Sequence, residues 1–203
     1  MQLLEKIREN AIMYPERIAV LNRSLISDND LTYQQLDQYS NRLACYIRNN
    51  AKQEKEPIIV YGHKSPYMLV AFLACVKAGH PYCPIDISNP YERIIDIIEE
   101  VNSSIVFSME KLEYEQEVVI DLETIKTICI DPSNDKDIIN LVGLAEDEVF
   151  YILFTSGSTG KPKGVEITYG CLNHFLLWTC EIVERFSIEN PVFLNQAPFS
   201  FDL

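Results

Sequence analysis

The chain has 203 residues, 47% of them hydrophobic and 23% charged, which is the composition of a globular protein long enough to bury a core. An excess of 30 Asp and Glu over 17 Lys and Arg gives a formal net charge of −13, which argues against nucleic acid or an anionic membrane as the partner. No charged-then-apolar leader opens the chain and no apolar run approaches about 18 residues, so we expect a cytoplasmic protein without membrane insertion.

The six cysteines form no C-x-x-C pair, and most of them lie in apolar runs. Metal sites and disulfide frameworks are recognised by paired spacings, which are missing here. We therefore interpret the cysteines as small buried hydrophobic residues in a reducing compartment, and we predict no metal site.

The first predicted elements are two helices and a short strand. Apolar residues at helical spacing predict a helix over about 3–14, and a strand follows over 18–21. The run Leu31-Thr-Tyr-Gln-Gln-Leu36 opens the second helix, with Thr32 and Gln35 at the spacing of a capping box. We assign no chemistry to this region.

A strand, a helix and a second strand follow in the order of a βαβ unit. The apolar run 57–62 predicts a strand, Ser65-Pro66 starts a helix that stops at Gly79, and 82–85 is the next strand. The crossover of such a unit is right-handed, and its two strands are parallel. We therefore predict an α/β fold with a mostly parallel sheet flanked by helices.

Two of the three histidines, His63 and His80, are candidates for a general base. His63 and His80 each lie near the end of a strand or helix, without a carboxylate at a telling spacing. His174 lies on a predicted helix among apolar residues. Structural or packing roles are therefore favoured for all three.

The middle of the chain is less informative. A helix capped at 89–92 leads to a strand at 105–107. The acidic region 109–148 carries short β-like runs at 118–120 and 128–130, which we interpret as strand–loop–strand decoration with a solvated surface.

The stretch 151–165 is the most informative part of the sequence. An apolar, β-prone run stops at a loop rich in hydroxyls and glycines, and a second β-prone stretch follows. A sheet presents a loop in this way at its carboxyl edge, where α/β proteins bind ligands. Glycines let backbone N–H groups turn toward one point, while hydroxyls and lysines add donors and positive charge. The loop residues are Thr155, Ser156, Gly157, Ser158, Thr159, Gly160, Lys161, Lys163 and Gly164. We predict that they hold a polyphosphate.

Two other interpretations of this loop fit less well. The G-x-x-x-x-G-K-[ST] loop of the P-loop NTPases has a different spacing, and Pro162 stands where its helix would have to open. A flexible Gly/Ser linker would not lie between two strands that are predicted to be buried.

A long helix and a strand are predicted beyond the loop. Thr168 is a plausible cap for a helix from 169 to about 186, and 192–195 is the strand. Five residues of the helix are predicted to face the core, namely Leu172, Phe175, Leu176, Thr179 and Val183.

From Thr155 to Gly164 the chain resembles, without a break, the phosphate loop of the adenylate-forming superfamily, which includes acyl-CoA synthetases, luciferases and the adenylation domains of peptide synthetases. The runs 31–36 and 76–86 also resemble motifs of adenylation domains, with mild departures at Pro81 and Cys83. The resemblance implies ATP and Mg²⁺ as cofactors. It also implies that the loop wraps the β- and γ-phosphates, with Lys163 adding positive charge.

The pair Phe201-Asp202 lies where adenylation domains that activate amino acids carry a Phe-Asp pair. The resemblance implies that Asp202 binds the α-ammonium group of the substrate, and a buried ammonium does need a paired negative charge. Relatives that activate fatty or aryl acids generally lack this aspartate. The alternative is that Asp202 is an ordinary residue at the end of a strand.

The wider run 195–203 resembles that of D-alanine:carrier-protein ligases, which load D-alanine for the esterification of teichoic acids. This implies activation of D-alanine as an adenylate and its transfer to the phosphopantetheine thiol of a carrier protein. An L-amino-acid adenylation domain, an acyl-CoA synthetase and a non-catalytic nucleotide- or carrier-binding module stay open as alternatives.

By this resemblance, residues 1–203 form the N-terminal portion of an adenylation domain. The stretches that hold adenine, ribose and magnesium, and the small C-terminal subdomain with its catalytic lysine, lie outside this portion. We therefore expect no catalytic residue within 1–203 and no complete reaction from these residues alone.

Overall fold

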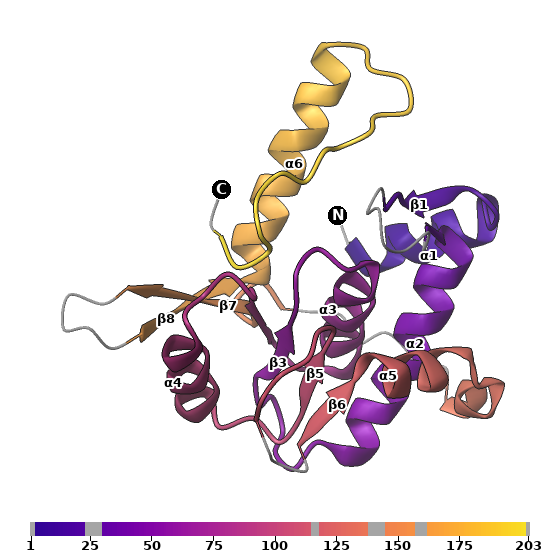
Figure 1. Cartoon of the computed structure of the whole chain (residues 1–203). Helices are drawn as coiled ribbons and strands as arrows, with labels where there is room; N and C mark the ends of the chain where they lie inside the picture. Colours follow the sequence, from indigo (N-terminus) through magenta and orange to yellow (C-terminus); the bar gives the residue numbers. More distant parts are fainter. Residues whose placement is uncertain (1–2, 23–29, 115–117, 138–144, 157–161, 202–203) are drawn as a thin grey trace.

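The computed structural model describes residues 3–22, 30–114, 118–137, 145–156 and 162–201. They form an α/β fold around a six-stranded sheet with the order β6-β5-β3-β4-β7-β8 (Figure 1). The neighbouring strands from β6 to β7 are parallel, and β8 is antiparallel to β7. The predicted mostly parallel sheet is therefore confirmed. The strands of the sheet are β3 (Ile58–Tyr61), β4 (Tyr82–Ile85), β5 (Val106–Ser108), β6 (Val119–Asp121), β7 (Val149–Ser156) and β8 (Pro162–Thr168).

Helices cover both faces of this sheet. Along β3, Ile58 and Val60 join one buried apolar cluster with α2, α3 and α5, whereas Ile59 and Tyr61 join a second cluster with α4. This alternation follows from the period of two in a strand, so both faces of β3 are buried. The helices are α1 (Leu3–Met13), α2 (Tyr33–Asn50), α3 (Pro66–Ala78), α4 (Tyr91–Val101), α5 (Leu122–Ile130) and α6 (Tyr169–Arg185).

Two small elements complete the N-terminal part. The strands β1 (Ile18–Val20) and β2 (Leu31–Thr32) pair in an antiparallel sheet next to α2. A short 3-10 helix, η1 (Pro132–Asp137), follows α5.

Local signals in the sequence set the helix ends. Thr32 Oγ1 accepts from the Gln35 N–H at 3.1 Å, and Gln35 Oε1 accepts from the Thr32 N–H at 2.9 Å. The predicted capping box is therefore confirmed. Helix α3 starts after Ser65, which caps it, and ends at Gly79, whose φ of 87° lies in the left-handed region that glycine adopts without strain.

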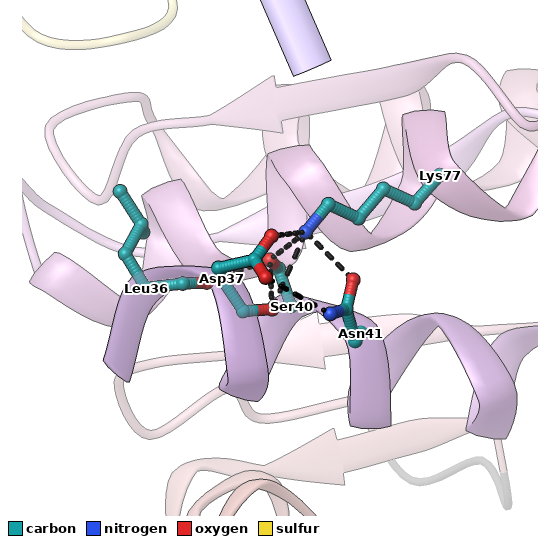
Figure 2. A network of polar contacts seen from close by, with 5 residues as sticks. All are labelled: Leu36, Asp37, Ser40, Asn41 and Lys77. Atoms are coloured by element: carbon teal, nitrogen blue, oxygen red, sulfur yellow. Dashed lines mark hydrogen bonds and ion pairs between the residues drawn. The ribbon is translucent and has the colours of Figure 1, made fainter. Parts of the chain in front are cut away.

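A buried lysine joins α3 to α2. The Lys77 side chain is 2% exposed, and its Nζ donates to Asp37 Oδ1, Ser40 Oγ and Asn41 Oδ1, each at 2.8 Å (Figure 2). With the Asp37 carbonyl oxygen at 3.3 Å as a fourth acceptor, all three hydrogens of the ammonium group are satisfied. Burial lowers the pKa of Lys77, and the Asp37 carboxylate opposes that effect. The network compensates a charge that would otherwise be costly to bury.

Helix α6 extends away from the body of the molecule (Figure 1). Among its residues, Tyr169 at the start is buried, whereas Phe175 and Trp178 are more than half exposed. The chain that follows α6 is also apolar and exposed. The exposed large hydrophobic residues of this arm are Phe175, Leu177, Trp178, Phe186, Ile188, Val192, Phe193 and Leu194.

Three expectations about secondary structure and about the core-facing side of α6 were wrong. Residues 128–130 end helix α5, because Asp121 caps this helix and Ile125 and Cys129 bury one of its faces at a spacing of four. Residues 192–195 form no strand. The prediction that five residues of α6 face the core was also wrong: Phe175 is 53% exposed, and Leu172, Leu176, Thr179 and Val183 are only partly buried.

Candidate functional site

The carboxyl ends of the parallel strands meet at one edge of the sheet. There, β3 leads into Gly62-His63-Lys64, β4 leads into Asp86, and β7 leads into the predicted phosphate loop. Strands β4 and β7 are paired, and Phe154 near the end of β7 packs against the cluster that contains Ile85 at the end of β4. Ligands of α/β proteins bind at this edge, so it is the candidate site.

Strands β7 and β8 frame the predicted phosphate loop as a hairpin, which confirms the predicted order of strand, loop and strand. Thr155 lies opposite Lys163, and its Oγ1 donates to the Lys163 carbonyl oxygen at 3.4 Å. Both residues are exposed. The hairpin therefore carries a threonine and a lysine at opposed, exposed positions next to the predicted phosphate loop.

The loop itself lies outside the described residues. The backbone of Ser156 makes the last pair of the hairpin, with Pro162. The side chain of Ser156 is not among the described parts, and neither are Gly157, Ser158, Thr159 and Gly160. Their proposed contacts with phosphate stay predictions.

Two further residues shape the end of the hairpin. Arg93 on α4 donates from Nη2 to the carbonyl oxygen of Phe154 at 3.0 Å, which adds a cation that the sequence did not single out. Gly164 lies within β8 rather than in a turn. A Cβ at Gly164 would come within 3.1 Å of Ile152 Cγ2 and 3.3 Å of the Phe154 ring, so close packing explains this glycine.

Asp202, predicted to bind the substrate ammonium, lies outside the described residues. The segment before it is described, and three contacts connect it to the body of the molecule. Arg17 Nη2 donates to Asn190 Oδ1 at 2.8 Å, and Lys64 Nζ donates to the carbonyl oxygen of Gln196. The Phe199 ring packs edge-to-face on Phe72 of α3, with ring centroids 5.4 Å apart.

His63 has a carboxylate partner that the sequence analysis missed. Its Nδ1 lies 2.8 Å from Asp86 Oδ2, and Asp86 is 2% exposed while the imidazole is 43% exposed. The other oxygen of Asp86 accepts from the Ser88 N–H at 2.9 Å. Burial by itself would raise the pKa of Asp86, but the hydrogen bonds from Ser88 and His63 outweigh it and hold that pKa below its usual range. Asp86 is therefore ionised at neutral pH.

This depressed pKa predicts a pH dependence of stability. A carboxyl group whose pKa is lowered in the folded state stabilises the fold at pH values above its ordinary pKa. This contribution is lost as the pH falls through the folded-state pKa. We expect Asp86→Asn to lower the free energy of unfolding by about 1–2 kcal/mol at pH 7, and the deficit to shrink as the solution is acidified below about pH 4. Urea unfolding of both proteins from pH 7 to pH 3 measures this. A deficit that stays constant with pH would contradict the assignment.

The other two histidines differ from each other. His80 is buried, and its Nδ1 lies 2.9 Å from the carbonyl oxygen of Glu56, which agrees with the structural role expected for it. His174 is exposed on α6, so the packing role expected for it was wrong.

The cysteines divide into two groups. Cys45, Cys75, Cys83 and Cys129 are buried, as expected for small hydrophobic residues, whereas Cys171 and Cys180 are exposed on α6. Within the described ranges, no group of three or more His, Cys, Asp or Glu side chains could hold a metal ion. No described helix has the length and apolar character needed to cross a membrane.

Comparison with known proteins gives a match over most of the chain. Residues 7–203 match the family model described as AMP-binding enzyme. The whole chain is 42% identical to D-alanine–D-alanyl carrier protein ligase of Bacillus mycoides (strain KBAB4) and 41% identical to the protein of the same name from Bacillus anthracis. The chain spans 39% of the length of each of these relatives.

Solved structures share the fold. The N-terminal subdomain of NpsA from Klebsiella oxytoca, in complex with 3-hydroxybenzoyl-AMSN, aligns with a TM-score of 0.65 at 25% identity over 83% of this chain and 41% of its own. Fatty acid AMP ligase from Legionella pneumophila aligns with a TM-score of 0.71 over 93% of this chain and 33% of its own, at 20% identity. The second likeness concerns the fold alone.

Proposed function

The chain belongs to the AMP-binding enzyme family, and from this we propose that it is the N-terminal portion of an ATP-dependent ligase that loads D-alanine onto a carrier protein. The observation that carries the proposal is the 42% identity, over the whole chain, to a protein named D-alanine–D-alanyl carrier protein ligase. A role in the D-alanylation of teichoic acids, in the cytoplasm, is part of the same proposal.

The proposed reaction has two steps. The carboxylate of D-alanine attacks the α-phosphorus of ATP, which forms an aminoacyl adenylate and releases pyrophosphate. The phosphopantetheine thiol of the carrier protein then attacks the adenylate carbonyl and releases AMP. Within this chain, the loop from Thr155 to Gly160 binds the β- and γ-phosphates, and Lys163 supplies positive charge. These groups stabilise the departing pyrophosphate, so their contribution is electrostatic positioning.

Mg²⁺ belongs to the proposal as the counter-ion of ATP. The described residues include no group of carboxylates and imidazoles that could hold it, so no step is assigned to a metal bound by them. Asp202 anchors the ammonium of the amino acid and thereby directs its carboxylate toward the α-phosphorus.

Amino-acid-dependent ATP–pyrophosphate exchange tests the proposal. The assay uses a chimeric ligase in which residues 1–203 replace the matching 39% of the Bacillus mycoides protein. We expect D-alanine to give the largest exchange rate in a panel with L-alanine, other amino acids and a fatty acid. A dominant L-amino acid would assign the chain to the adenylation domains of peptide synthetases, and a dominant fatty acid would assign it to the acyl-activating enzymes.

Lys163→Ala in the chimeric ligase is expected to raise the KM for ATP and to slow adenylation, by about tenfold in kcat/KM, because one charge next to the pyrophosphate is lost. Lys55→Ala is a matched control, since Lys55 is an exposed lysine whose partner is Glu148. Unchanged exchange kinetics in Lys163→Ala would remove Lys163 from the phosphate site.

The exposed arm formed by α6 and residues 186–194 supports the proposal that residues 1–203 are one portion of a larger domain. Isolated soluble proteins rarely expose apolar patches of this kind, and the matched relatives are more than twice as long as this chain. We propose that the polypeptide corresponding to the rest of the relatives covers the arm. The isolated chain is then expected to lack ligase activity.

The fluorescence of Trp178 can test whether another polypeptide covers the arm, because Trp178 is the single tryptophan of the chain and is 56% exposed on α6. We expect its fluorescence emission to move to shorter wavelength when residues 1–203 are co-expressed with the remaining portion of the Bacillus mycoides ligase, whose own tryptophans are replaced by phenylalanine. Trp178→Phe is the control that assigns the signal. An unchanged emission in a complex that does form would show that this side of α6 stays in water.

A further inference from the structure

The chain that leads into Asp202 returns to the body of the molecule after α6. It contacts the β3–α3 loop and α3 itself at two points, Gln196 and Phe199. Phe199 also packs against the main apolar cluster of the sheet, and the Phe201 N–H donates to the Pro198 carbonyl oxygen at 3.1 Å. The segment that precedes Asp202 is therefore attached to α3 through Phe199 and to the loop before α3 through Lys64.

The backbone around Lys64 is held in place by its neighbours on both sides. Its φ of 51° lies in the left-handed region, which few non-glycine residues adopt. On one side, His63 is bound to the buried Asp86 carboxylate at 2.8 Å, and on the other, Ser65 caps helix α3. The strand end is fixed as well, since the Gly62 N–H donates to the Ile85 carbonyl oxygen at 3.0 Å. The backbone on both sides of Lys64 is thus attached to the sheet and to α3.

The ammonium of Lys64 has a neutral acceptor rather than a carboxylate. Its acceptor is the Gln196 carbonyl oxygen, and within the described part of the chain Lys64 forms no ion pair. A hydrogen bond from a charged donor is stronger than one between neutral groups. Lys64 therefore fixes the position of the backbone six residues before Asp202, while Phe199 fixes it three residues before.

We propose that Lys64 is a positioning residue for the amino acid substrate. It holds the backbone at Gln196 and thereby positions Asp202, and the His63–Asp86 pair in turn fixes the backbone of Lys64. The inference rests on the proposed function, because it assigns to Asp202 the substrate ammonium. Lys64 does not contact the substrate or ATP in this arrangement. Its loss changes the binding of the amino acid and leaves the binding of ATP unchanged.

The test compares Lys64→Met and Lys64→Arg in the chimeric ligase. We expect Lys64→Met to raise the KM for D-alanine by about 5- to 10-fold, which corresponds to one partly exposed charged hydrogen bond, and to leave the KM for ATP within about twofold. Lys64→Arg keeps a charged donor and should recover most of the loss. Lys126→Met, at a partly exposed lysine paired with Glu123 on α5, is the control for loss of a surface charge.

Each outcome decides one question. Equal KM values for D-alanine in Lys64→Met and the unmodified chimera would overturn the inference, and so would a parallel rise in the KM for ATP. Failure of the unmodified chimera to exchange with any amino acid would instead overturn the proposed function. The two failures are therefore distinguishable.

A second measurement needs no activity and uses the chain of 203 residues itself. Hydrogen–deuterium exchange of the backbone amides in 196–201 is expected to become faster in Lys64→Met, whereas the amides of β3 and β4 keep their rates. Unchanged exchange in 196–201 would show that Phe199 alone holds this segment, and the proposal would fail. A general rise that includes β3 and β4 would show loss of the fold instead, which also contradicts a local positioning role.

Discussion

Asp202→Ala in the chimeric ligase is expected to reduce kcat/KM for D-alanine in ATP–pyrophosphate exchange by about 10²- to 10³-fold. If Asp202 pairs with the substrate ammonium as proposed, the variant leaves that ammonium without its negative partner, and removal of one member of a buried ion pair costs about 3–5 kcal/mol. The KM for ATP should change little, because the proposal assigns the phosphates to the loop from Thr155 to Gly160. Asp96→Ala, at an exposed aspartate of α4, is the matched control.

Propionate sharpens this test, because it has the carbon skeleton of alanine without the ammonium group. If Asp202 acts on the ammonium, Asp202→Ala should abolish the preference for D-alanine over propionate while it leaves the weak exchange with propionate unchanged. An equal loss for both acids would mean that Asp202 supports the structure of the site. Retained exchange with D-alanine would remove Asp202 from substrate binding.

Lys77→Ala is expected to lower the free energy of unfolding by about 3–5 kcal/mol, as measured by urea denaturation of the chain. The substitution removes the donor shared by Asp37, Ser40 and Asn41 and leaves a partly buried carboxylate without its counter-ion. Lys126→Ala is the control, since an exposed ion pair of this kind contributes less than about 1 kcal/mol.

A double variant separates charge from packing at this position. Lys77→Met keeps most of the apolar stem, and Asp37→Leu removes the carboxylate that the first change leaves unpaired. Because an apolar pair of similar volume can replace a buried ion pair at little cost, the double variant should recover most of the stability that Lys77→Met loses. Additive losses in the two single variants and the double variant would show that the Lys77–Asp37 contact contributes nothing of its own.

Features that depend on neighbouring residues could be predicted from the sequence. The capping box of Thr32 and Gln35, the helix that starts after Ser65 and the strands on either side of the predicted phosphate loop are all recognised from short local patterns. Helix α5 was missed because its β-branched residues resemble a strand over three positions. The cap at Asp121 was the signal that could have corrected this.

Contacts between distant residues were harder to foresee. His63 and Asp86 are 23 residues apart, and the parallel register of β3 and β4, with Tyr61 opposite Ile85, brings them together. The predicted βαβ unit implied that β3 and β4 are parallel. It did not give their register, which is what places His63 next to Asp86. For α6, the apolar periodicity correctly predicted a helix. Such periodicity indicates that one face of the helix becomes buried, but it does not identify the element that packs against that face.

The order of the strands has a consequence for synthesis on the ribosome. The central strand β3 is the first of the sheet to leave the exit tunnel, and each later strand pairs with one that already exists: β4 and β5 with β3, β6 with β5, β7 with β4 and β8 with β7. The nascent sheet can therefore grow outward at its two edges without opening a pair that has formed, in keeping with folding that proceeds from the N-terminus during translation.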